Sequence, residues 1–468
     1  MVLKVYNTLT RRLETFTPRH DKKVQMFVCG QTVQDDAHMG HAKTYVQFDI
    51  IVRWLRHLGH DVYYAQNITD VDDKIINKAK EKGIDPLTLS KEQAQRFLDD
   101  LDALGVKKNV NVFPKTSEYI PQMIEQIKTL IKKGYAYVVD GDVYFNVAKF
   151  EDYTKLSRMP VDELKKHRIE PDPRKKNPFD FSLWKAQKAD ELAWESPWGK
   201  GRPGWHIEDT AMTWALFGVQ YDLHGGASEL IFPHHTNEIA QAEAFSGKKP
   251  FVKYWLHTGV LQIGGIEMHK SLKNFVTIRE MLNKYDAETI RLYYASTHYR
   301  KPIDFNEKDF EEPRRELEYL YNTLRNLKDA SSKEGKESPE LDDAAKETRV
   351  KFTEAMNNDF NTPQVLTHLY ALAKKANTIA SQQNIGLRTA QKAINTITEL
   401  ANILGILEKG IPSEEELPQK ARDLAAKREE ARSRKDWKMA DEIREQIKAL
   451  GFILEDTPEG PRFRKINH

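Results

Sequence analysis

The sequence predicts an α/β fold: a parallel sheet in an N-terminal domain that an insertion divides, then a helical domain and a small C-terminal module. Two observations predict this organisation. Strand-like and helix-like segments alternate through about the first 120 residues and again from Leu223 to beyond Ile290, which is typical of a parallel sheet. Beyond Phe310 the apolar residues recur at spacings of three and four, which is typical of helices. The length of 468 residues agrees with about three domains of ~150 residues each.

The composition excludes several classes of protein. Hydrophobic residues make up 40% and charged residues 30% of the chain, which excludes wholesale disorder. The net charge of +2 gives no overall positive field, so a nucleic-acid site must come from local clustering of Lys and Arg. The single cysteine, Cys29, excludes an intrachain disulfide and suits a reducing compartment. Because no run of about 18 apolar residues and no secretory segment occurs, we expect a cytoplasmic protein without a membrane partner.

The first strand–helix–strand unit lies near the N-terminus. Lys23–Cys29 is a short apolar run that ends at Gly30, as expected of a strand. Ala42–Leu58 has apolar residues at helical spacing, and Gly59 follows it as a stop signal. Asp61–Gln66 has the composition of the next strand. A helical crossover of this length joins parallel strands.

A hairpin and an irregular insertion are expected before the sheet resumes. Tyr135–Val147 contains two strand-like runs around Asp140-Gly141, a turn pair that can reach positive φ. Glu151–Pro203 is rich in Lys, Asp and Pro and has weak periodicity. We therefore expect an inserted module with irregular structure in that segment.

The second half of the chain is expected to be mainly helical. One apolar face is traced by Phe310, Leu317, Leu320, Tyr321, Leu324 and Leu327. Ser331–Asp343 is a polar loop, and Val350–Leu407 continues as amphipathic helix. A polar stretch at Pro412–Gln419 leads to a last helix, Trp437–Leu450, with Gly451 as its stop.

The segment His38-Met39-Gly40-His41 is the strongest local signal, because it follows the first strand and precedes its helix. Gly40 lets a ligand approach the backbone, and the helix N-terminus offers free N–H groups to a phosphate. His38 and His41 are three residues apart and can both face that phosphate. The tetrad alone agrees equally well with surface or capping histidines. Its position at the carboxyl end of a strand favours a binding site.

Two other groups of residues are candidates for chemistry. The loop sequence EMHKSL contains Lys270, and a mobile lysine can stabilise charge on a nucleotide's phosphates, although an isolated loop lysine is usually only solvated. Cys29, Asp209, His234 and Glu238 carry side chains that are competent zinc ligands. His234 and Glu238 are four residues apart in a helix-like segment and can point the same way, but such pairs are also common without a metal.

These residues lie in stretches that together resemble one family. In chain order the stretches are FVCGQTVQDDAHMGHAKTYVQFD, NITDVDDKIINKA, GRPGWHIEDTAM, YDLHGGASELIFPHHTNEIAQAEA, EMHKSLKNF and KDWKMADEIREQIKALG. Through them the chain resembles the cysteinyl-tRNA synthetases, which are class I aminoacyl-tRNA synthetases, along nearly its whole length. The resemblance implies a Rossmann-like catalytic domain in two halves. The implied parts are the catalytic halves 1–111 and 202–305, an insertion for the tRNA acceptor end at 112–201, a helical domain at 306–411 and an anticodon-binding domain at 412–468.

The resemblance also implies roles for individual residues. His38, His41 and Lys270 would bind ATP and stabilise the transition state of amino-acid activation, with Gly40 and Ser271 beside them. The residues implied to line the amino-acid pocket are Trp205, His206, Thr69 and Asp70. The stretch EMHKSLKNF matches the signature loop of the family but departs from its pattern. Glu267 and His269 stand where the family has lysine and serine. Since Lys270 is retained, we expect activity to survive, with weaker binding of ATP.

In this family a zinc ion held by two cysteines, a histidine and a glutamate binds the substrate thiolate. Cys29, His234 and Glu238 match that pattern, whereas Asp209 stands in place of the second cysteine. The total ligand charge is unchanged, and zinc–oxygen bonds of ~2.0–2.2 Å replace a zinc–sulfur bond of ~2.3 Å, so the metal should lie in nearly the same place. We expect one Zn²⁺ per chain, more Lewis-acidic but less firmly held because oxygen is a harder ligand. Mg²⁺ is expected to accompany ATP.

The C-terminal module contains a local basic cluster in a nearly neutral chain. Its members are Lys427, Arg428, Arg432, Arg434, Lys435 and Lys438. Trp437 beside them can stack on an unpaired base. Helical spacing with Ala440 and Ile443 instead favours an apolar, inward face for Trp437. The resemblance favours the first reading, because this module binds the anticodon in the family, and it points to Trp437, Asp441 and Arg428 as contacts.

The function that the resemblance implies is activation of L-cysteine with ATP, through cysteinyl-adenylate, and transfer to tRNA(Cys) by a monomer. Zinc–thiolate bonding would separate cysteine from serine, since pocket shape alone separates near-isosteres by only ~1–3 kcal/mol. A paralogous ligase that joins cysteine to an amino sugar is one alternative, but those enzymes lack the C-terminal module. A non-catalytic RNA-binding relative is the other, favoured by Asp209 and opposed by the retained histidines and Lys270.

Overall fold

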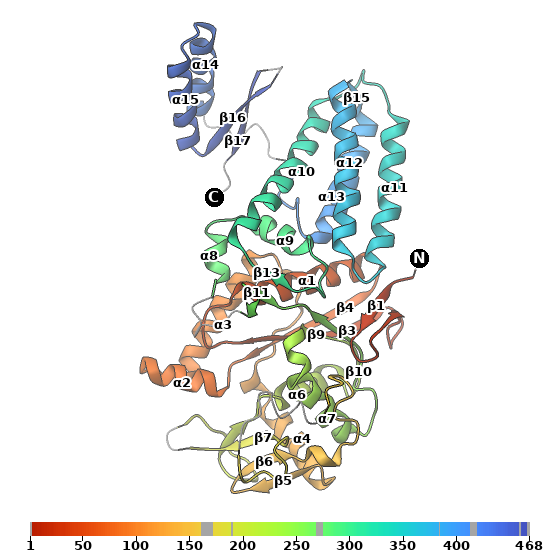
Figure 1. The fold of residues 1–468 in the computed structure, drawn as a ribbon, viewed down its shortest axis with the longest axis vertical. Helices are drawn as coiled ribbons and strands as arrows, with labels where there is room; N and C mark the ends of the chain where they lie inside the picture. Colours follow the sequence, from red (N-terminus) through yellow and green to blue (C-terminus); the bar gives the residue numbers. More distant parts are fainter. Residues whose placement is uncertain are drawn as a thin grey trace.

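A parallel sheet lies at the centre of the computed structural model, which describes residues 2–160, 172–188, 191–267, 275–382, 384–411, 419–457 and 460–465 (Figure 1). Its strands are β3 (Lys23–Thr32), β4 (Asp61–Thr69), β9 (Tyr221–Ala227) and β10 (Val252–Thr258). They lie in the order β10-β9-β3-β4, and each neighbouring pair is parallel. The prediction of an α/β fold with a parallel sheet is therefore confirmed.

Helices cover both faces of this sheet. On one face lie α1 (Met39–His57) and α9 (Ala287–Ala295), and on the other lie α6 (Ile207–Phe217) and α7 (His234–Ser246) (Figure 1). Successive side chains of β3 point to opposite faces of the sheet, because a β-strand is pleated. Val28 packs in the core on the side of α1, whereas Cys29 packs in the core on the side of α6 and α7. The side chain of Cys29 is thus directed toward the helices that carry the other predicted metal ligands.

Shorter elements complete the sheet domain around these layers. The N-terminal hairpin is β1 (Lys4–Asn7) and β2 (Arg12–Thr15). The helices α2 (Asp73–Lys82) and α3 (Pro86–Ala103) follow β4. The elements after β10 are β11 (Leu261–Ile263), β12 (Ile266–Glu267), α8 (Ile278–Leu282) and β13 (Ile303–Asp304).

The insertion contains more regular structure than the sequence predicts. After α4 (Ile120–Lys132), the strands β5 (Ala136–Val139), β6 (Asp142–Phe145), β7 (Phe181–Ala186) and β8 (Gly201–Pro203) form one antiparallel sheet in this order. The hairpin turn at Asp140-Gly141 is confirmed, with φ of 51° and 88°. The expectation of irregular structure over 151–203 is wrong for β7 and β8, because these short strands gain their stability from pairing with β6 and with each other rather than from a periodic sequence.

Four long helices form the next part of the chain. They are α10 (Glu311–Asp329), α11 (Pro339–Met356), α12 (Thr362–Gln382) and α13 (Leu387–Leu404), with the short paired strands β14 (Ser331–Ser332) and β15 (Ile385–Gly386) at one end. The predicted apolar face of α10 is buried. The polar loop is shorter than expected, because the Ser338 side chain accepts a hydrogen bond from the Leu341 N–H and starts α11 early.

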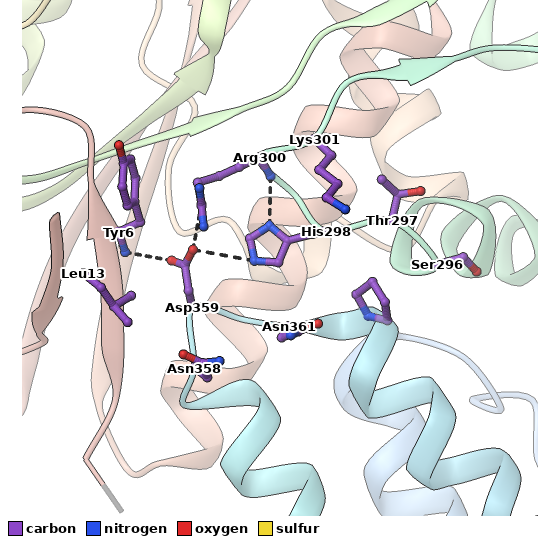
Figure 2. A pocket seen from close by; sticks show the side chains of 11 residues that line it. Tyr6, Leu13, Ser296, Thr297, His298, Arg300, Lys301, Asn358, Asp359 and Asn361 are labelled. Atoms are coloured by element: carbon purple, nitrogen blue, oxygen red, sulfur yellow. Dashed lines mark hydrogen bonds and ion pairs between the residues drawn. The ribbon is translucent and has the colours of Figure 1, made fainter. Parts of the chain in front are cut away.

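A cavity of about 620 Å³ lies where this helical part meets the sheet domain (Figure 2). Asp359, in the turn between α11 and α12, accepts hydrogen bonds from the Tyr6 N–H and from Arg300 Nε, both at 2.7 Å. His298 Nε2 lies 3.6 Å from the same carboxylate. Among the residues that the structure describes, none of the predicted site residues lines this cavity, so we interpret this ion-pair network as a joint between the two parts.

The C-terminal module has its own small core. It consists of α14 (Gln419–Ser433), α15 (Trp437–Ala449), β16 (Phe452–Thr457) and β17 (Gly460–Lys465). Its core residues include Ala425, Ile443, Ile447 and Phe452. The predicted stop at Gly451 is confirmed, with φ of 87°. None of the helices in the described part of the chain is long and apolar enough to cross a membrane.

Gly30 shapes the end of β3, and replacing it with alanine is expected to destabilise the fold. The pairing of β3 with β4 shifts register between Val28 and Gln31, and an added Cβ at Gly30 would lie 1.6 Å from the carbonyl oxygen of Asn67. Because that atom belongs to the backbone of the central sheet, we expect Gly30→Ala to lower the free energy of unfolding by about 3 kcal/mol. Chemical denaturation of the full chain measures this.

Gly83→Ala is the matched control for Gly30→Ala. Gly83 ends α2 with φ of 66° and has open space where a Cβ would lie. Alanine at position 83 is destabilising only because of the left-handed backbone conformation, which lowers the free energy of unfolding by about 1–2 kcal/mol. A loss at Gly30 no larger than the loss at Gly83 would contradict the close approach of the two strands.

Candidate active site and metal centre

The four predicted metal ligands come together beneath the carboxyl end of β3. Cys29 Sγ lies 3.1 Å from Asp209 Oδ2, on α6. His234 Nε2, on α7, lies 3.1 Å from Asp209 Oδ2 and 3.1 Å from Glu238 Oε1. All four side chains are buried, and one ligand atom from each falls within 4.8 Å of the others. Three elements distant in sequence thus place a thiol, an imidazole and two carboxylates in one volume.

The chemistry of this volume fits a divalent cation. Burial and the nearby Asp209 carboxylate raise the pKa of both Cys29 and Glu238. Neither oxygen of the Glu238 carboxylate accepts a hydrogen bond from any residue that the structure describes. A buried carboxylate without hydrogen bonds is costly unless a cation compensates it. The donors are sulfur, nitrogen and oxygen, which is the usual mixture for zinc, so the Cys29/His/Glu cluster is consistent with a zinc site.

Two histidines of this cluster were missed by the sequence analysis. His224 Nε2 and His235 Nε2 lie 3.3 Å and 3.1 Å from Cys29 Sγ. Both side chains are fully buried. A signal was available, because His235 directly follows His234 and His224 lies in the predicted strand that resumes the sheet.

Asn67 is a further residue that the sequence analysis missed. Its Nδ2 donates to Asp209 Oδ1 at 2.7 Å, while its Oδ1 accepts from the Gly30 N–H at 2.6 Å. Asn67 therefore orients the carboxylate that stands in the place of a thiolate, and it ties that carboxylate to the end of β3. This contact crosses from β4 to α6, so no local pattern in the sequence indicates it.

The predicted amino-acid pocket is only partly assembled around the cluster. The Trp205 ring stacks on His234 with centroids 4.3 Å apart, and His206 Nδ1 lies 2.9 Å from His234 Nδ1. Thr69 Oγ1 donates to Glu208 Oε1, next to Asp209, at 2.8 Å.

Asp70, the fourth predicted pocket residue, is engaged elsewhere. Its carboxylate accepts hydrogen bonds from the N–H and the hydroxyl of Ser117, at 2.9 Å and 2.6 Å. These bonds hold the short turn that precedes α4. The structure therefore assigns Asp70 contacts outside the cluster, in contrast to Trp205, His206 and Thr69.

The HMGH residues form the first turn of α1. His38 is the N-cap, and its Nδ1 accepts from the Gly40 N–H at 3.0 Å. His41 Nδ1 accepts from the His38 N–H at 3.3 Å, and the two rings stack with centroids 3.8 Å apart. An added Cβ at Gly40 would lie 2.8 Å from the His38 ring, which explains the glycine between the histidines.

The protonation of these rings follows from their contacts. Since each Nδ1 accepts a hydrogen bond, the neutral imidazoles carry their proton on Nε2. Burial and the neighbouring His38 lower the pKa of His41 well below its ordinary value. The expectation that the start of this helix offers free N–H groups is wrong, because the N–H groups of Met39, Gly40 and His41 already donate to Val276 O, His38 Nδ1 and His38 O. The donors that the tetrad can present to phosphate oxygens are instead the Nε2–H groups of the two rings.

Part of the signature loop lies outside the described residues, including His269, Lys270 and Ser271. The described segment that follows the loop is anchored near His38. The Met39 N–H donates to Val276 O and the Ile278 N–H to Ala37 O, both at 3.0 Å. The Phe275 ring meets the His38 ring edge-on, with centroids 5.2 Å apart. On the other side, Glu267 pairs with Gln262 in the strands β12 and β11.

The predicted anticodon residues differ in exposure. Trp437 is 60% exposed in the first turn of α15, so the alternative that it packs on an inward apolar face is wrong. Asp441 is exposed one turn further along. Arg428 is only 5% exposed, and its guanidinium lies 3.1 Å from the Glu429 carboxylate. This burial makes Arg428 far less accessible to a base than Trp437 or Asp441.

Comparison with protein families divides the chain into three matched parts. Residues 15–315 match the model described as tRNA synthetases class I (C) catalytic domain. Residues 351–408 match the DALR domain, and residues 414–464 match the cysteinyl-tRNA ligase anticodon binding domain. The α/β domain, the helical part and the C-terminal module are thus each matched by a family model.

Whole-chain relatives and solved structures agree with these matches. The cysteine–tRNA ligases of Carboxydothermus hydrogenoformans and Thermococcus onnurineus are 44% and 43% identical to this chain, over 99% and 100% of it and over the full length of each relative. The methionyl-tRNA synthetase of Mycobacterium tuberculosis shares the fold at 14% identity, with a TM-score of 0.62 over 84% of this chain and 92% of that one. The chain therefore belongs to the cysteinyl-tRNA synthetases, a family of class I aminoacyl-tRNA synthetases.

Proposed function

We propose that the chain activates L-cysteine with ATP and transfers it to tRNA(Cys) through a cysteinyl-adenylate. The observation that carries this proposal is the position of its one cysteine. Cys29 lies at the end of β3 in a cluster of buried metal ligands, and the same strand leads within ten residues to the imidazoles at the start of α1. A site for a thiol and a site for phosphate would therefore both lie at the carboxyl end of β3, an inner strand of the sheet.

Recognition of the amino acid would depend on the cluster around Cys29. One zinc ion held by Cys29, Asp209, His234 and Glu238 would supply a Lewis acid that takes the thiol of the substrate as its thiolate. Asn67 keeps the Asp209 carboxylate oriented, and the Trp205 ring covers His234. A serine hydroxyl ionises poorly at neutral pH, so the same site disfavours serine.

Activation would take place over the first turn of α1. The carboxylate of cysteine attacks the α-phosphorus of ATP, an oxygen–phosphorus bond forms, and pyrophosphate leaves with the bonding electrons. The Nε2–H groups of His38 and His41 donate to the phosphate oxygens on which charge builds. We assign to Lys270 the stabilisation of the same negative charge on the phosphate oxygens. Ser271 follows it in the chain, and Mg²⁺ would be bound with ATP. In the second step the terminal ribose hydroxyl of tRNA attacks the carbonyl carbon and AMP leaves.

RNA binding would involve both ends of the L-shaped tRNA. We assign the acceptor end to the insertion at 112–201 and the anticodon to the C-terminal module, where Trp437 and Asp441 are exposed. The match of residues 414–464 to an anticodon-binding domain supports this function over the amino-sugar ligase, which lacks that module. Charging of tRNA(Cys) with radiolabelled cysteine tests the proposal. Cysteine-dependent pyrophosphate exchange without any charged tRNA would favour the amino-sugar ligase instead.

Trp437→Ala is expected to weaken tRNA binding without affecting activation. Stacking of a base on an aromatic ring contributes about 1–3 kcal/mol, so the KM for tRNA should rise about 5- to 150-fold. The rate of cysteine-dependent pyrophosphate exchange should stay unchanged, because the catalytic site lies in another domain. Met439→Ala is the matched control, since Met439 is also exposed on α15. An unchanged KM for tRNA in the Trp437 variant would remove this tryptophan from the RNA contact.

A further inference from the structure

The cluster around Cys29 contains two complete sets of metal ligands. The first is the set already described, with Asp209 and His234. The second consists of Cys29, His224, His235 and Glu238, and its ligand atoms also lie within 4.8 Å of one another. Both sets share the thiol of Cys29 and the carboxylate of Glu238. We call them the outer set, which contains Asp209, and the inner set, which contains His224 and His235.

The distances within the inner set are close to those of a tetrahedral site. His224 Nε2 and His235 Nε2 lie 3.3 Å and 3.1 Å from Cys29 Sγ. The same two nitrogens lie 3.6 Å from Glu238 Oε2 and 4.0 Å from Glu238 Oε1. Zinc bonds of ~2.0–2.3 Å at tetrahedral angles separate neighbouring ligand atoms by about 3.3–3.6 Å. The measured distances of 3.1–4.0 Å lie around this spacing, so small side-chain movements would bring one atom of each residue onto a single ion.

The Nδ1 atom of each histidine has a polar partner within hydrogen-bond distance, as is usual for histidines that bind a metal through Nε2. His224 Nδ1 lies 2.5 Å from the Tyr221 hydroxyl, and its ring stacks on Trp255. His235 Nδ1 lies 2.8 Å from His257 Nε2, and His257 in turn contacts Thr8 Oγ1 at 2.8 Å. A hydrogen-bond partner on one ring nitrogen fixes the orientation of the ring and directs its other nitrogen to the metal.

The two sets differ in chemistry and in the residues that surround them. The outer set offers one sulfur, one nitrogen and two oxygens, whereas the inner set offers one sulfur, two nitrogens and one oxygen. Zinc favours imidazole over a further carboxylate, and the inner charges of one thiolate and one carboxylate balance Zn²⁺. All six side chains of the two sets are nearly inaccessible to solvent, and the half-buried Trp205 ring stacks on His234 of the outer set.

We infer that the inner set is a second position for the zinc ion of this chain, which retains the metal where Asp209 alone would hold it poorly. The inference rests on the proposed function, because it concerns the same ion. In the outer position the ion is next to Trp205, a predicted residue of the substrate pocket. In the inner position it lies on the side of Tyr221, Trp255 and His257. His224 and His235 thereby compensate in metal retention for the carboxylate at position 209.

Zinc retention in the full-length Asp209→Ala variant tests this inference. If the two positions have comparable affinity, the variant should keep about one zinc per chain, with an affinity lowered about tenfold or less in a chelator competition. X-ray absorption at the zinc edge should then show two imidazole ligands, which the outer set cannot supply. Loss of zinc from this variant would overturn the inference.

A second variant, His235→Gln, tests the inference independently if Asp209→Ala disturbs the fold. His235→Gln should leave zinc bound in the outer position, with one imidazole in the absorption spectrum. The double variant should lose zinc affinity by more than about 100-fold, because neither position is then complete. His60→Gln, at a histidine that packs on Phe16, is the control. If Asp209→Ala loses as much zinc affinity as the double variant, the inner set does not bind metal.

These outcomes separate the inference from the proposed function. A wild-type chain that charges tRNA(Cys) and binds zinc, but loses the zinc with Asp209, overturns only the inner position. A wild-type chain that binds no zinc and shows no cysteine-dependent exchange overturns both.

Discussion

Cys29→Ala is expected to abolish metal binding and to raise the KM for cysteine by about 100- to 1,000-fold. Cys29 supplies the only thiol of the chain, and its Sγ lies within 3.1–3.3 Å of Asp209, His224 and His235. Its removal leaves every possible position of the ion one ligand short. Metal content by mass spectrometry and cysteine-dependent pyrophosphate exchange measure the two effects.

Cys29→Ser provides the control for side-chain volume. A serine fills nearly the same space at the end of β3 but does not ionise at neutral pH, so the serine variant should fold normally and still lose the metal. Circular dichroism and thermal melting check the fold of both variants. A Cys29→Ala chain that keeps zinc and the wild-type KM for cysteine would contradict the site described here.

His41→Ala is expected to lower the rate constant of cysteine activation by about 100- to 1,000-fold, the usual cost of one donor to a developing negative charge. Zinc content should not change, because His41 lies on α1 and not in the cluster around Cys29. His57→Gln is the matched control, since His57 lies at the opposite end of the same helix and is exposed. Pre-steady-state pyrophosphate exchange gives the rate constant directly.

The pH dependence of activation reports the charge on His41. Burial and His38 hold the pKa of His41 well below the ordinary value of 6.5, so the ring is neutral on both sides of that value. The rate constant should therefore be level between about pH 6 and pH 8. If His41 acted as an imidazolium with an ordinary pKa, the rate constant would fall as the pH rises through 6.5, and that result would contradict the assignment.

The parts of the fold that the sequence predicts well are those with a local cause. The helix at 39–57 and the strands on either side of it follow from the spacing of apolar residues and from Gly59. The four outer ligands follow from their chemical type and from a matching family pattern. In these cases each residue can be interpreted from its neighbours in the chain.

The parts that the sequence does not predict depend on contacts between distant segments. β7 and β8 are strands because β6 pairs with β7 and β7 with β8. Asn67 reaches Asp209 across the gap from β4 to α6. His224 and His235 belong to the metal cluster only because β9 lies beside β3 in the sheet and α7 packs on the same face as Cys29. No periodicity in the sequence indicates such pairings.

The most direct test of the account is cysteine-dependent ATP–pyrophosphate exchange by the purified chain, with serine in place of cysteine as the control. The same samples are assayed before and after removal of zinc with a chelator. We predict exchange with cysteine, almost none with serine, and loss of the exchange with the zinc. Exchange that is equally fast with serine, or that persists unchanged without zinc, would contradict the central claim that the cluster around Cys29 selects the substrate through a metal–thiolate bond.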